Sequence, residues 1–228
     1  MIRLQDISKI YNQGKHNEYA ALHQIGLALK LNEMVVFKGP SGSGKTTLLS
    51  IIGCISRPTA GRIWLDGRET TSLPERFAAA LRRETFGFIF QNYHLIRGLT
   101  VLENTMVPAY PSGRSYRHIK ERALTLLAQL DLSAKARQAV EHLSGGEQQR
   151  AAIARALIND PRIIIADEPT AHLDTELAGR LMTMLSDLKK EGKTVLVASH
   201  DPLVYGTASV DRVVPMRDGS IGNAEEIR

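Results

Sequence analysis

The sequence predicts an α/β fold with a mostly parallel core sheet, and three features of the chain support this prediction. Four short apolar runs end in polar or glycine-rich turns, which is typical of buried parallel strands. Helical patterns lie between these runs, as in a parallel sheet that helices cover. One run leads directly into the stretch GPSGSGKTT, from Gly39 to Thr47, which opens a helix. The length of 228 residues fits one large domain or two small ones.

The first part of the chain is predicted to consist mostly of strands. Ile2–Leu4 and Ile25–Leu31 have the alternation of strands, and the apolar run Met34–Phe37 has the length of a buried strand. Helical spacing then extends from Thr46 to Ile55. The stretch Gly61–Gly67 predicts another strand that ends in a tight turn.

The second part continues the alternation around a helical middle region. From Thr100 to Leu132 the apolar spacing is mostly helical, with an interruption at Pro108–Gly113. The other predicted elements are an apolar strand at 86–91, a helix from Gly145, a strand at 163–166, a helix at 177–188, a strand at 195–198 and a closing hairpin made of 210–215 and 219–221.

Charge and cysteine content exclude several classes of protein. The chain has 29 basic and 24 acidic residues, and the basic residues are too dispersed to form a nucleic-acid stripe, so no nucleic-acid partner is expected. Its single cysteine, Cys54, cannot form an intrachain disulfide, which favours a reducing, cytosolic location. The first residues lack the apolar segment of a signal peptide, and no run of about 18 apolar residues predicts a membrane span.

The stretch from Gly39 to Thr47 has the spacing of a phosphate-binding loop, or P-loop. Glycines let successive N–H groups turn toward phosphate oxygens, and the helix that follows adds its positive end. A Gly/Ser turn without a ligand would also fit these letters, but the strand before it and the helix after it favour the P-loop. Lys45 is expected to reach the β- and γ-phosphates, and Thr46 to bind Mg²⁺. The predicted nucleotide-binding residues here are Gly39, Pro40, Ser41, Gly42, Ser43, Gly44, Lys45, Thr46 and Thr47.

Two carboxylates follow the strand at 163–166. Asp167 and Glu168 lie at its C-terminal end, which is where α/β sheets bind ligands. Asp167 is expected to hold the hydration shell of Mg²⁺, and Glu168 to polarise a water molecule aimed at the γ-phosphate. A solvated turn before Pro169 is the alternative interpretation, and the presence of the P-loop argues against it.

The octapeptide LSGGEQQR, from Leu143 to Arg150, marks the start of another helix. Ser144 is a good N-cap, and Gly145 and Gly146 leave backbone amides open to an anion. A simple capped helix start is the alternative. The whole octapeptide, however, resembles the signature of the ABC ATPases, and together with the P-loop and the two carboxylates the resemblance extends over residues 2 to 221.

The resemblance implies an ABC-type P-loop NTPase with an N-terminal antiparallel β part and an inserted α-helical subdomain at about 92–158, in a single domain covering 1–228. In this family two copies meet head to tail and enclose two ATP molecules with Mg²⁺. Ser144, Gly145 and Gly146 would then contact the γ-phosphate of the ATP bound to the partner copy. Asn32 stands where the family usually has glycine, and asparagine tolerates the left-handed conformation that this position requires.

The resemblance also implies roles for positions outside the three motifs. Tyr11 would stack on adenine, Gln91 would sense Mg²⁺ and the attacking water, and the segment 92–103 would meet the membrane partner. Asp174 of the D-loop, residues 171–174, would reach across the dimer, and His200 would hydrogen-bond the γ-phosphate. The expected catalytic residues are therefore Lys45, Gln91, Glu168 and His200, and the expected metal ligands are Thr46, Gln91 and Asp167.

The resemblance predicts an ATP-hydrolysing subunit at the inner face of the cell membrane that energises a separate membrane-spanning subunit. The motif text is most similar to the lipoprotein-release, macrolide-efflux and cell-division group (LolD, MacB and FtsE types). The main alternative is a soluble ABC ATPase of DNA repair or translation, but such proteins usually carry coiled-coil inserts, zinc modules or two cassettes. A regulatory module that holds ATP without hydrolysing it is a third alternative, which Glu168 and His200 argue against.

Overall fold

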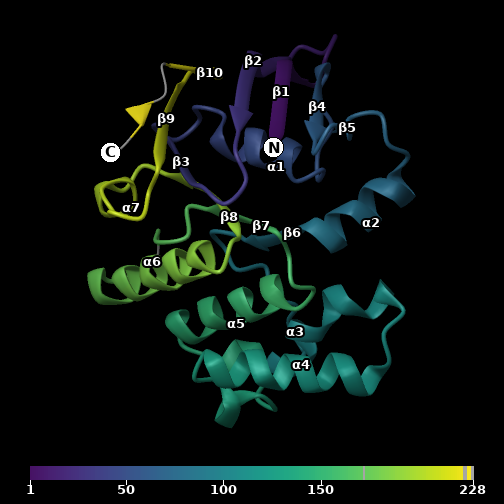
Figure 1. The fold of residues 1–228 in the computed structure, drawn as a ribbon, viewed down its shortest axis with the longest axis vertical. Helices are drawn as coiled ribbons and strands as arrows, with labels where there is room; N and C mark the ends of the chain where they lie inside the picture. Colours follow the sequence, from purple (N-terminus) through teal and green to yellow (C-terminus); the bar gives the residue numbers. More distant parts are fainter. Residues whose placement is uncertain (172, 223–224, 227–228) are drawn as a thin grey trace.

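The computed structural model describes residues 1–171, 173–222 and 225–226, and it arranges them in layers (Figure 1). An antiparallel sheet forms one outer layer, and helix α1 (Lys45–Ile52) packs between it and a larger, mostly parallel sheet. Further helices cover the opposite face of the larger sheet. This is the α/β architecture with an antiparallel part and added helices that the sequence predicts.

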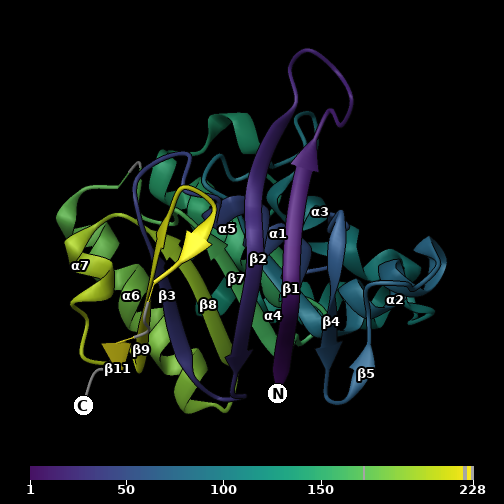
Figure 2. The same cartoon turned by 90° about the horizontal axis from the view of Figure 1, so that it is seen from above.

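The antiparallel sheet has the strand order β2-β1-β4-β5. Strands β1 (Ile2–Tyr11) and β2 (Tyr19–Leu29) pair along most of their length, as Figure 2 shows. Both extend beyond their predicted outer ends, because bulges at Asp6 and Gln24, with φ values of 51° and 45°, interrupt the alternation, and β2 ends at Leu29 rather than Leu31. The other two strands are β4 (Ala60–Leu65) and β5 (Arg68–Glu69).

The larger sheet has the order β10-β9-β3-β8-β7-β6, and neighbours from β6 to β9 are parallel. Strands β10 and β11 each pair antiparallel with β9, which confirms the predicted closing hairpin of β9 and β10. The strand bounds are β3 (Met34–Lys38), β6 (Phe86–Ile89), β7 (Ile163–Asp167), β8 (Thr194–Ser199), β9 (Arg212–Arg217), β10 (Ser220–Ile221) and β11 (Glu225–Glu226).

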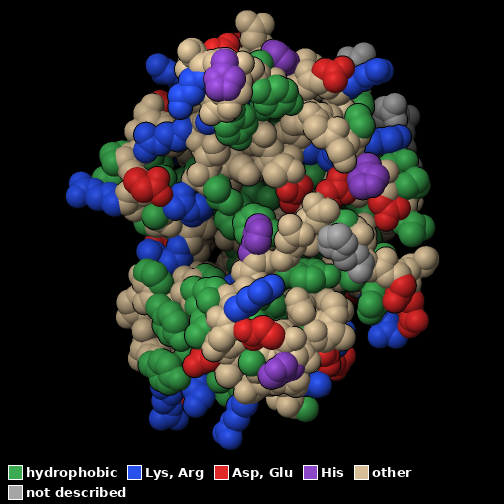
Figure 3. All heavy atoms as spheres, turned by 180° about the vertical axis from the view of Figure 1, so that it is seen from behind, with side chains coloured by type: hydrophobic (Ala, Val, Ile, Leu, Met, Phe, Trp, Pro, Cys, Tyr) green, Lys and Arg blue, Asp and Glu red, His purple; other side chains and the backbone are tan. Residues whose placement is uncertain are grey.

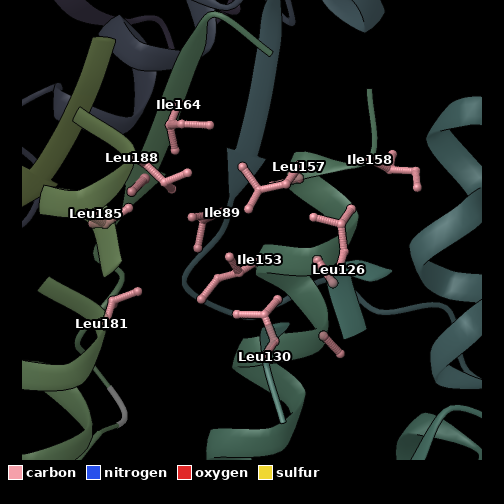
Figure 4. Close-up of a cluster of buried hydrophobic side chains, with 14 of the residues drawn as sticks. Ile89, Leu126, Leu130, Ile153, Leu157, Ile158, Ile164, Leu181, Leu185 and Leu188 are labelled. Carbon is pink, nitrogen blue, oxygen red and sulfur yellow. The ribbon is translucent and has the colours of Figure 1, made fainter. Parts of the chain in front are cut away.

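The central strands are buried on both faces, and their side chains alternate between two apolar clusters. In β7, Ile163 and Ile165 join the cluster that contains α1, whereas Ile164 and Ala166 join the cluster under the other helices (Figure 4). Because successive side chains point to opposite faces, the next residue, Asp167, points to the α1 side. The period of the strand thus directs this carboxylate toward the P-loop.

The helices on the far side of the sheet form the lower half of Figure 1. Helices α3, α4 and α5 pack on one another, and their apolar side chains share one cluster with α6 and the sheet. Among the described residues, no helix combines the length and apolar character needed to cross a membrane. The remaining bounds are α2 (Glu75–Thr85), α3 (Val101–Met106), α4 (Tyr116–Gln129), α5 (Gly145–Leu157), α6 (Thr175–Lys190), α7 (Pro202–Tyr205) and the 3₁₀-helices η1 (Val107–Ser112), η2 (Ser133–Lys135) and η3 (Val140–His142).

Two helices were not predicted from the sequence, α2 and α7. Only Ala78 and Thr85 are buried in α2, so few of its residues belong to the core, and α7 is a single turn capped by Asp201. The interruption predicted at Pro108–Gly113 corresponds to the 3₁₀-helix η1. Asn32 has a φ of 63°, which is the left-handed conformation expected at a position where the family usually has glycine.

A pair of glycine substitutions tests the packing between β6 and α5. A Cβ atom at Gly87 would lie 2.5 Å from the Ala156 carbonyl oxygen and 2.8 Å from Pro161, so Gly87→Ala is expected to destabilise the fold by about 1–3 kcal/mol. Gly179 lies in α6 with no atom near its Cβ position, and Gly179→Ala is expected to stabilise by roughly 0.5–1 kcal/mol. Urea unfolding measures both, and equal effects of the two changes would contradict the packing described.

Candidate active site

The P-loop connects β3 to α1 and leaves the start of the helix open. Gly42 and Gly44 have φ values of 80° and 98°, and a Cβ at Gly44 would lie 2.7 Å from the Ala21 carbonyl oxygen. Gly44 is the N-cap of α1, and no side chain caps this end. The first N–H groups of α1 therefore point into the loop without a side-chain acceptor, which is the arrangement that binds anions.

Lys45 folds back over this loop and is buried, with 5% of its surface exposed. Its Nζ donates hydrogen bonds to the carbonyl oxygens of Gly39 at 2.7 Å and Pro40 at 3.0 Å. The same Nζ lies 3.4 Å from a carboxylate oxygen of Glu168. A positive charge is thus held at the centre of the loop by two carbonyls and one carboxylate.

Thr46 and Asp167 converge beside Lys45, as the strand period requires. The Thr46 hydroxyl donates a hydrogen bond to the Asp167 carboxylate at 3.0 Å. Burial raises the pKa of the Asp167 carboxyl above its ordinary value, and the Glu168 charge raises it further, whereas Thr46 and Lys45 act in the opposite direction. The positive charge beside Asp167 therefore does not fully compensate for the burial of its carboxylate.

This pair of oxygen donors fits Mg²⁺, which binds few protein ligands and keeps water and phosphate oxygens around it. Within the described part of the chain, no group of three or more His, Cys, Asp or Glu residues could form a metal site by itself. A hydroxyl and a carboxylate beside a phosphate-binding loop match that requirement, because the phosphate would supply further ligands.

Glu168 and His200 meet at the C-terminal ends of β7 and β8. His200 Nδ1 lies 3.1 Å from both carboxylate oxygens of Glu168. Glu168 has a φ of 45°, a left-handed conformation that is uncommon for a residue with a side chain. Its N–H donates to the Ala198 carbonyl, which fixes the conformation against the neighbouring strand β8. Glu168 and His200, two of the four residues predicted to be catalytic, are therefore in contact.

A cavity of about 310 Å³ lies between the P-loop and the antiparallel sheet. Gln91, which follows β6, reaches it, as does Glu168. Tyr19 of β2 also lines it and donates from its hydroxyl to the Gly42 carbonyl at 3.3 Å. The lining residues are Tyr19, Ala21, Ser41, Gly42, Ser43, Gly44, Lys45, Thr46, Thr47, Gln91 and Glu168.

Tyr11, the residue expected to stack on adenine, lies beside this cavity rather than in its lining. It pairs across the strands with Tyr19, it is 39% exposed, and the Lys9 Nζ lies 5.0 Å from the centre of its ring. Tyr19 was not identified from the sequence. The signal that points to it is its register position opposite Tyr11, which only the pairing of β1 with β2 establishes.

The signature residues lie at a different place, where α5 and α6 begin. Ser144 caps α5 in a capping box with Glu147, and Asp174 caps α6 by accepting from the Leu177 N–H. A Cβ at Gly146 would lie 3.1 Å from Leu177, so the two helix starts are in contact. None of Ser144, Gly145, Gly146 and Asp174 lines the P-loop cavity among the described residues. His172 of the D-loop lies outside the described residues.

The turn between β9 and β10 supports the P-loop from behind. Gly219 donates its N–H to the Ser43 carbonyl at 3.2 Å, and its own carbonyl accepts from the His23 N–H at 2.9 Å. Its φ is 72°, and a Cβ there would lie 2.7 Å from the Ala21 carbonyl oxygen. This glycine was not identified from the sequence, because its contacts join three segments that are far apart in the chain.

Comparison with solved structures finds the same fold. The structure titled "Dimeric Structure of MJ0796, a Bacterial ABC Transporter Cassette" superimposes with a TM-score of 0.92 and is 40% identical in sequence, covering all of this chain and 99% of that one. A post-hydrolysis state of the same cassette, bound to ADP and Pi, gives a TM-score of 0.91. CbiO1 of Clostridium perfringens, part of the transporter complex cbiONQ, is 27% identical and gives 0.81.

Sequence comparison finds the same group of proteins as the structural comparison. The family model described as "ABC transporter" matches residues 22–171. The macrolide export ATP-binding/permease protein MacB of Agrobacterium fabrum is 43% identical over 221 residues, which are 97% of this chain and 34% of the relative. The same-named protein of Hahella chejuensis is 42% identical over the same length. The chain spans about a third of the length of these curated relatives.

Replacing Asp167 with asparagine is expected to stabilise the protein without ligand at neutral pH. Burial raises the pKa of this carboxyl, so the fold disfavours the ionised form, and a neutral amide removes that cost. We expect the melting temperature to rise by about 2–4 °C, which corresponds to about 1 kcal/mol in a protein of this size. Differential scanning calorimetry measures the change.

The pH dependence of this gain follows from the direction of the shift. The stabilisation should be complete above the folded-state pKa of Asp167 and should disappear below its ordinary value of 3.8, where the carboxyl is protonated in both states. Asp187→Asn is the control, because Asp187 is an exposed residue that pairs with Lys190 on α6. An unchanged melting temperature of Asp167→Asn at neutral pH would show that burial does not disfavour this charge.

Proposed function

Because the chain belongs to the ABC transporter family, we propose that it binds and hydrolyses ATP to energise the membrane-spanning part of a transporter. The observation that carries this proposal is the convergence of Lys45, Thr46, Asp167, Glu168 and His200 at the ends of three neighbouring strands. The state of the MJ0796 cassette with ADP and Pi supports hydrolysis in a closely similar fold.

The P-loop is proposed to receive the phosphates of ATP. The open N–H groups at the start of α1 and the Lys45 ammonium face the place where the phosphate oxygens would lie. Thr46 and Asp167 would hold Mg²⁺, with Gln91 at the edge of the same cavity. When bound, this ion neutralises charge on the phosphates. Thr46 and Asp167 are already 3.0 Å apart, so little rearrangement is needed.

Glu168 is proposed to orient the attacking water. Its carboxylate can accept a proton from water while the water attacks the γ-phosphate in line with the leaving oxygen. Lys45 and His200 would stabilise the charge that develops on the phosphate. Without a ligand, the carboxylate contacts these same two side chains.

A second copy of the chain is proposed to complete the site. Ser144, Gly145 and Gly146 present an anion-binding helix start, but they do not line the P-loop cavity of their own chain. A head-to-tail dimer places them over the phosphates of the partner, with Asp174 beside the same interface. The dimeric structure of the MJ0796 cassette supports this arrangement. Tyr11 and Tyr19 are proposed as the aromatic surface for adenine.

The membrane-spanning partner is proposed to dock between α2 and the helical region. A groove of about 490 Å³ runs there, and it is mostly apolar. Figure 3 shows hydrophobic side chains gathered over the helical part of the molecule, with Lys and Arg side chains along the edge. The groove includes Phe88 and Phe90 of the segment that leads to Gln91, so an occupant would contact the segment that enters the active site.

The family places this function at the inner face of the cell membrane, and we propose this location for the chain. The segment 92–158 is proposed as the helical insert of a single domain that covers 1–228. The names of the relatives support export of the macrolide type as the process that is energised. They do not support the alternative of a soluble ATPase of DNA repair or translation, and no nucleic-acid partner is proposed.

Glu168→Gln tests the hydrolytic role. The amide keeps the shape of the side chain but cannot accept the proton from water, so kcat should fall by about 10²–10⁴-fold. ATP binding should persist, and the variant should form a stable dimer with ATP in size-exclusion chromatography. Glu176→Gln is the control, because Glu176 is exposed on α6 and pairs with Arg180. Hydrolysis by Glu168→Gln at the wild-type rate would exclude Glu168 as the base.

Gly219→Ala tests the support of the P-loop. The added Cβ would clash with the Ala21 carbonyl, displace the turn from Ser43 and weaken binding of ADP to the monomer by about tenfold, which corresponds to about 1.4 kcal/mol. Gly192→Ala is the matched control, because Gly192 has a φ of 88° and no atom near its Cβ position. Both variants carry backbone strain, and equal ADP affinity by isothermal titration calorimetry would remove the role given to Gly219.

A further inference from the structure

We propose that Gln149 is a positioning residue that links the two ATP sites of the dimer, by tying the signature helix α5 to the segment that carries Glu168. This inference rests on the proposed function, because it requires the head-to-tail dimer. It adds a route between the sites that lies within one chain and passes through the hydrogen bond from Gln149 to Pro169.

The bond joins the signature helix to the segment that follows β7. The Gln149 side chain is buried, with 4% of its surface exposed, and its Nε2 donates to the Pro169 carbonyl at 2.5 Å. Gln149 lies three positions after Gly146, on the first turns of a helix whose following residues are buried in the core. A displacement of the signature end of α5 would therefore move the Gln149 amide with it.

The segment that receives this bond is held under strain. Glu168 adopts a left-handed conformation with a φ of 45°, and such a conformation persists only where the surroundings impose it. Its N–H donates to the Ala198 carbonyl, and the Thr170 hydroxyl donates to the Asp201 carboxylate at 3.2 Å. These two contacts anchor the segment to β8 and to the turn after it. Both contacts come from the C-terminal end of β8, where His200 also lies.

Gln149 anchors the same segment from the opposite side. Among the described residues that hydrogen-bond to the segment 168–171, Gln149 is the one that comes from the helical region. The acceptor belongs to Pro169, whose ring fixes its φ and so removes one of the backbone rotations between this carbonyl and Glu168. The position of α5 is therefore transmitted to the catalytic carboxylate through a short, stiff connection.

The two ends of this link belong to different ATP sites of the dimer. The start of α5 contacts the ATP bound to the partner chain, whereas Glu168 acts on the ATP bound to its own chain. ATP binding at one site would fix the position of α5 and thereby the position of Glu168 at the other site. The Gln149 bond thus makes hydrolysis at each site depend on occupancy of the other, which is a coupling between distinct sites.

Gln149→Met tests the link, because methionine has a similar size and no donor. We expect kcat to fall by about tenfold, the amount that corresponds to about 1.4 kcal/mol in the barrier. We expect the Hill coefficient for ATP to fall toward one, and the affinity of the monomer for ADP to stay unchanged. The control is Gln138→Met, since the Gln138 amide donates to the His142 carbonyl on the surface of the helical region.

Mixed dimers separate this role from a simple contribution to folding. One dimer combines a Gln149→Met chain with a Glu168→Gln chain, so the remaining active Glu168 lies in the chain without the link. The other dimer carries both changes in one chain and none in the other, so the active Glu168 keeps its link. Both contain the same two substitutions. The proposal expects about tenfold slower hydrolysis in the first dimer than in the second, the same difference in barrier as above.

Three outcomes decide between the possibilities. Equal rates in the two mixed dimers, or a wild-type Hill coefficient in Gln149→Met, would overturn the link while the proposed ATPase stands. Loss of ADP binding in Gln149→Met would also overturn it, because the bond would then serve only to maintain the fold. Absence of ATP hydrolysis by the wild-type chain would instead overturn the proposed function itself.

Discussion

The ammonium group of Lys45 is a buried positive charge, and such a charge requires compensation inside the protein. The Gly39 and Pro40 carbonyls and the Glu168 carboxylate supply it. This is possible only because β3, which leads to Lys45, and β7, which leads to Glu168, flank the same strand β8. Under the proposed function, an incoming phosphate takes over this compensation. The Glu168 carboxylate is then released from Lys45 and can orient the attacking water.

The same arrangement explains why two adjacent carboxylates have different surroundings. The strand period directs Asp167 to the α1 side, where Thr46 meets it. Glu168 lies beyond the strand end, and its left-handed backbone turns its side chain toward Lys45 and His200. Burial disfavours the charge of Asp167, so the site is least stable when it lacks a cation. The strain at Glu168 and the charge at Asp167 are both costs that a ligand can offset.

Residue patterns predict the parts of this site that depend on local structure. The spacing of glycines, the period of β7 and the N-cap at Ser144 determine the P-loop, the direction of Asp167 and the start of α5. Tyr19 and Gly219 could not be found in this way, since their roles arise from contacts with Gly42 and Ser43, which lie in other parts of the chain. Helix α2 was missed for a different reason, because it is strongly polar and only Ala78 and Thr85 in it are buried.

Two helix starts in this chain are suited to an anion, yet they face different places. The start of α1 opens into the P-loop cavity, whereas the start of α5 touches the start of α6 and takes no part in that cavity. In the proposed head-to-tail dimer, a phosphate bound at α1 of one chain is shared with α5 of the other. In that dimer each chain carries half of two sites. In the coupling proposed above, the signal crosses from α5 to the end of β7, and the Gln149 amide is placed on that path.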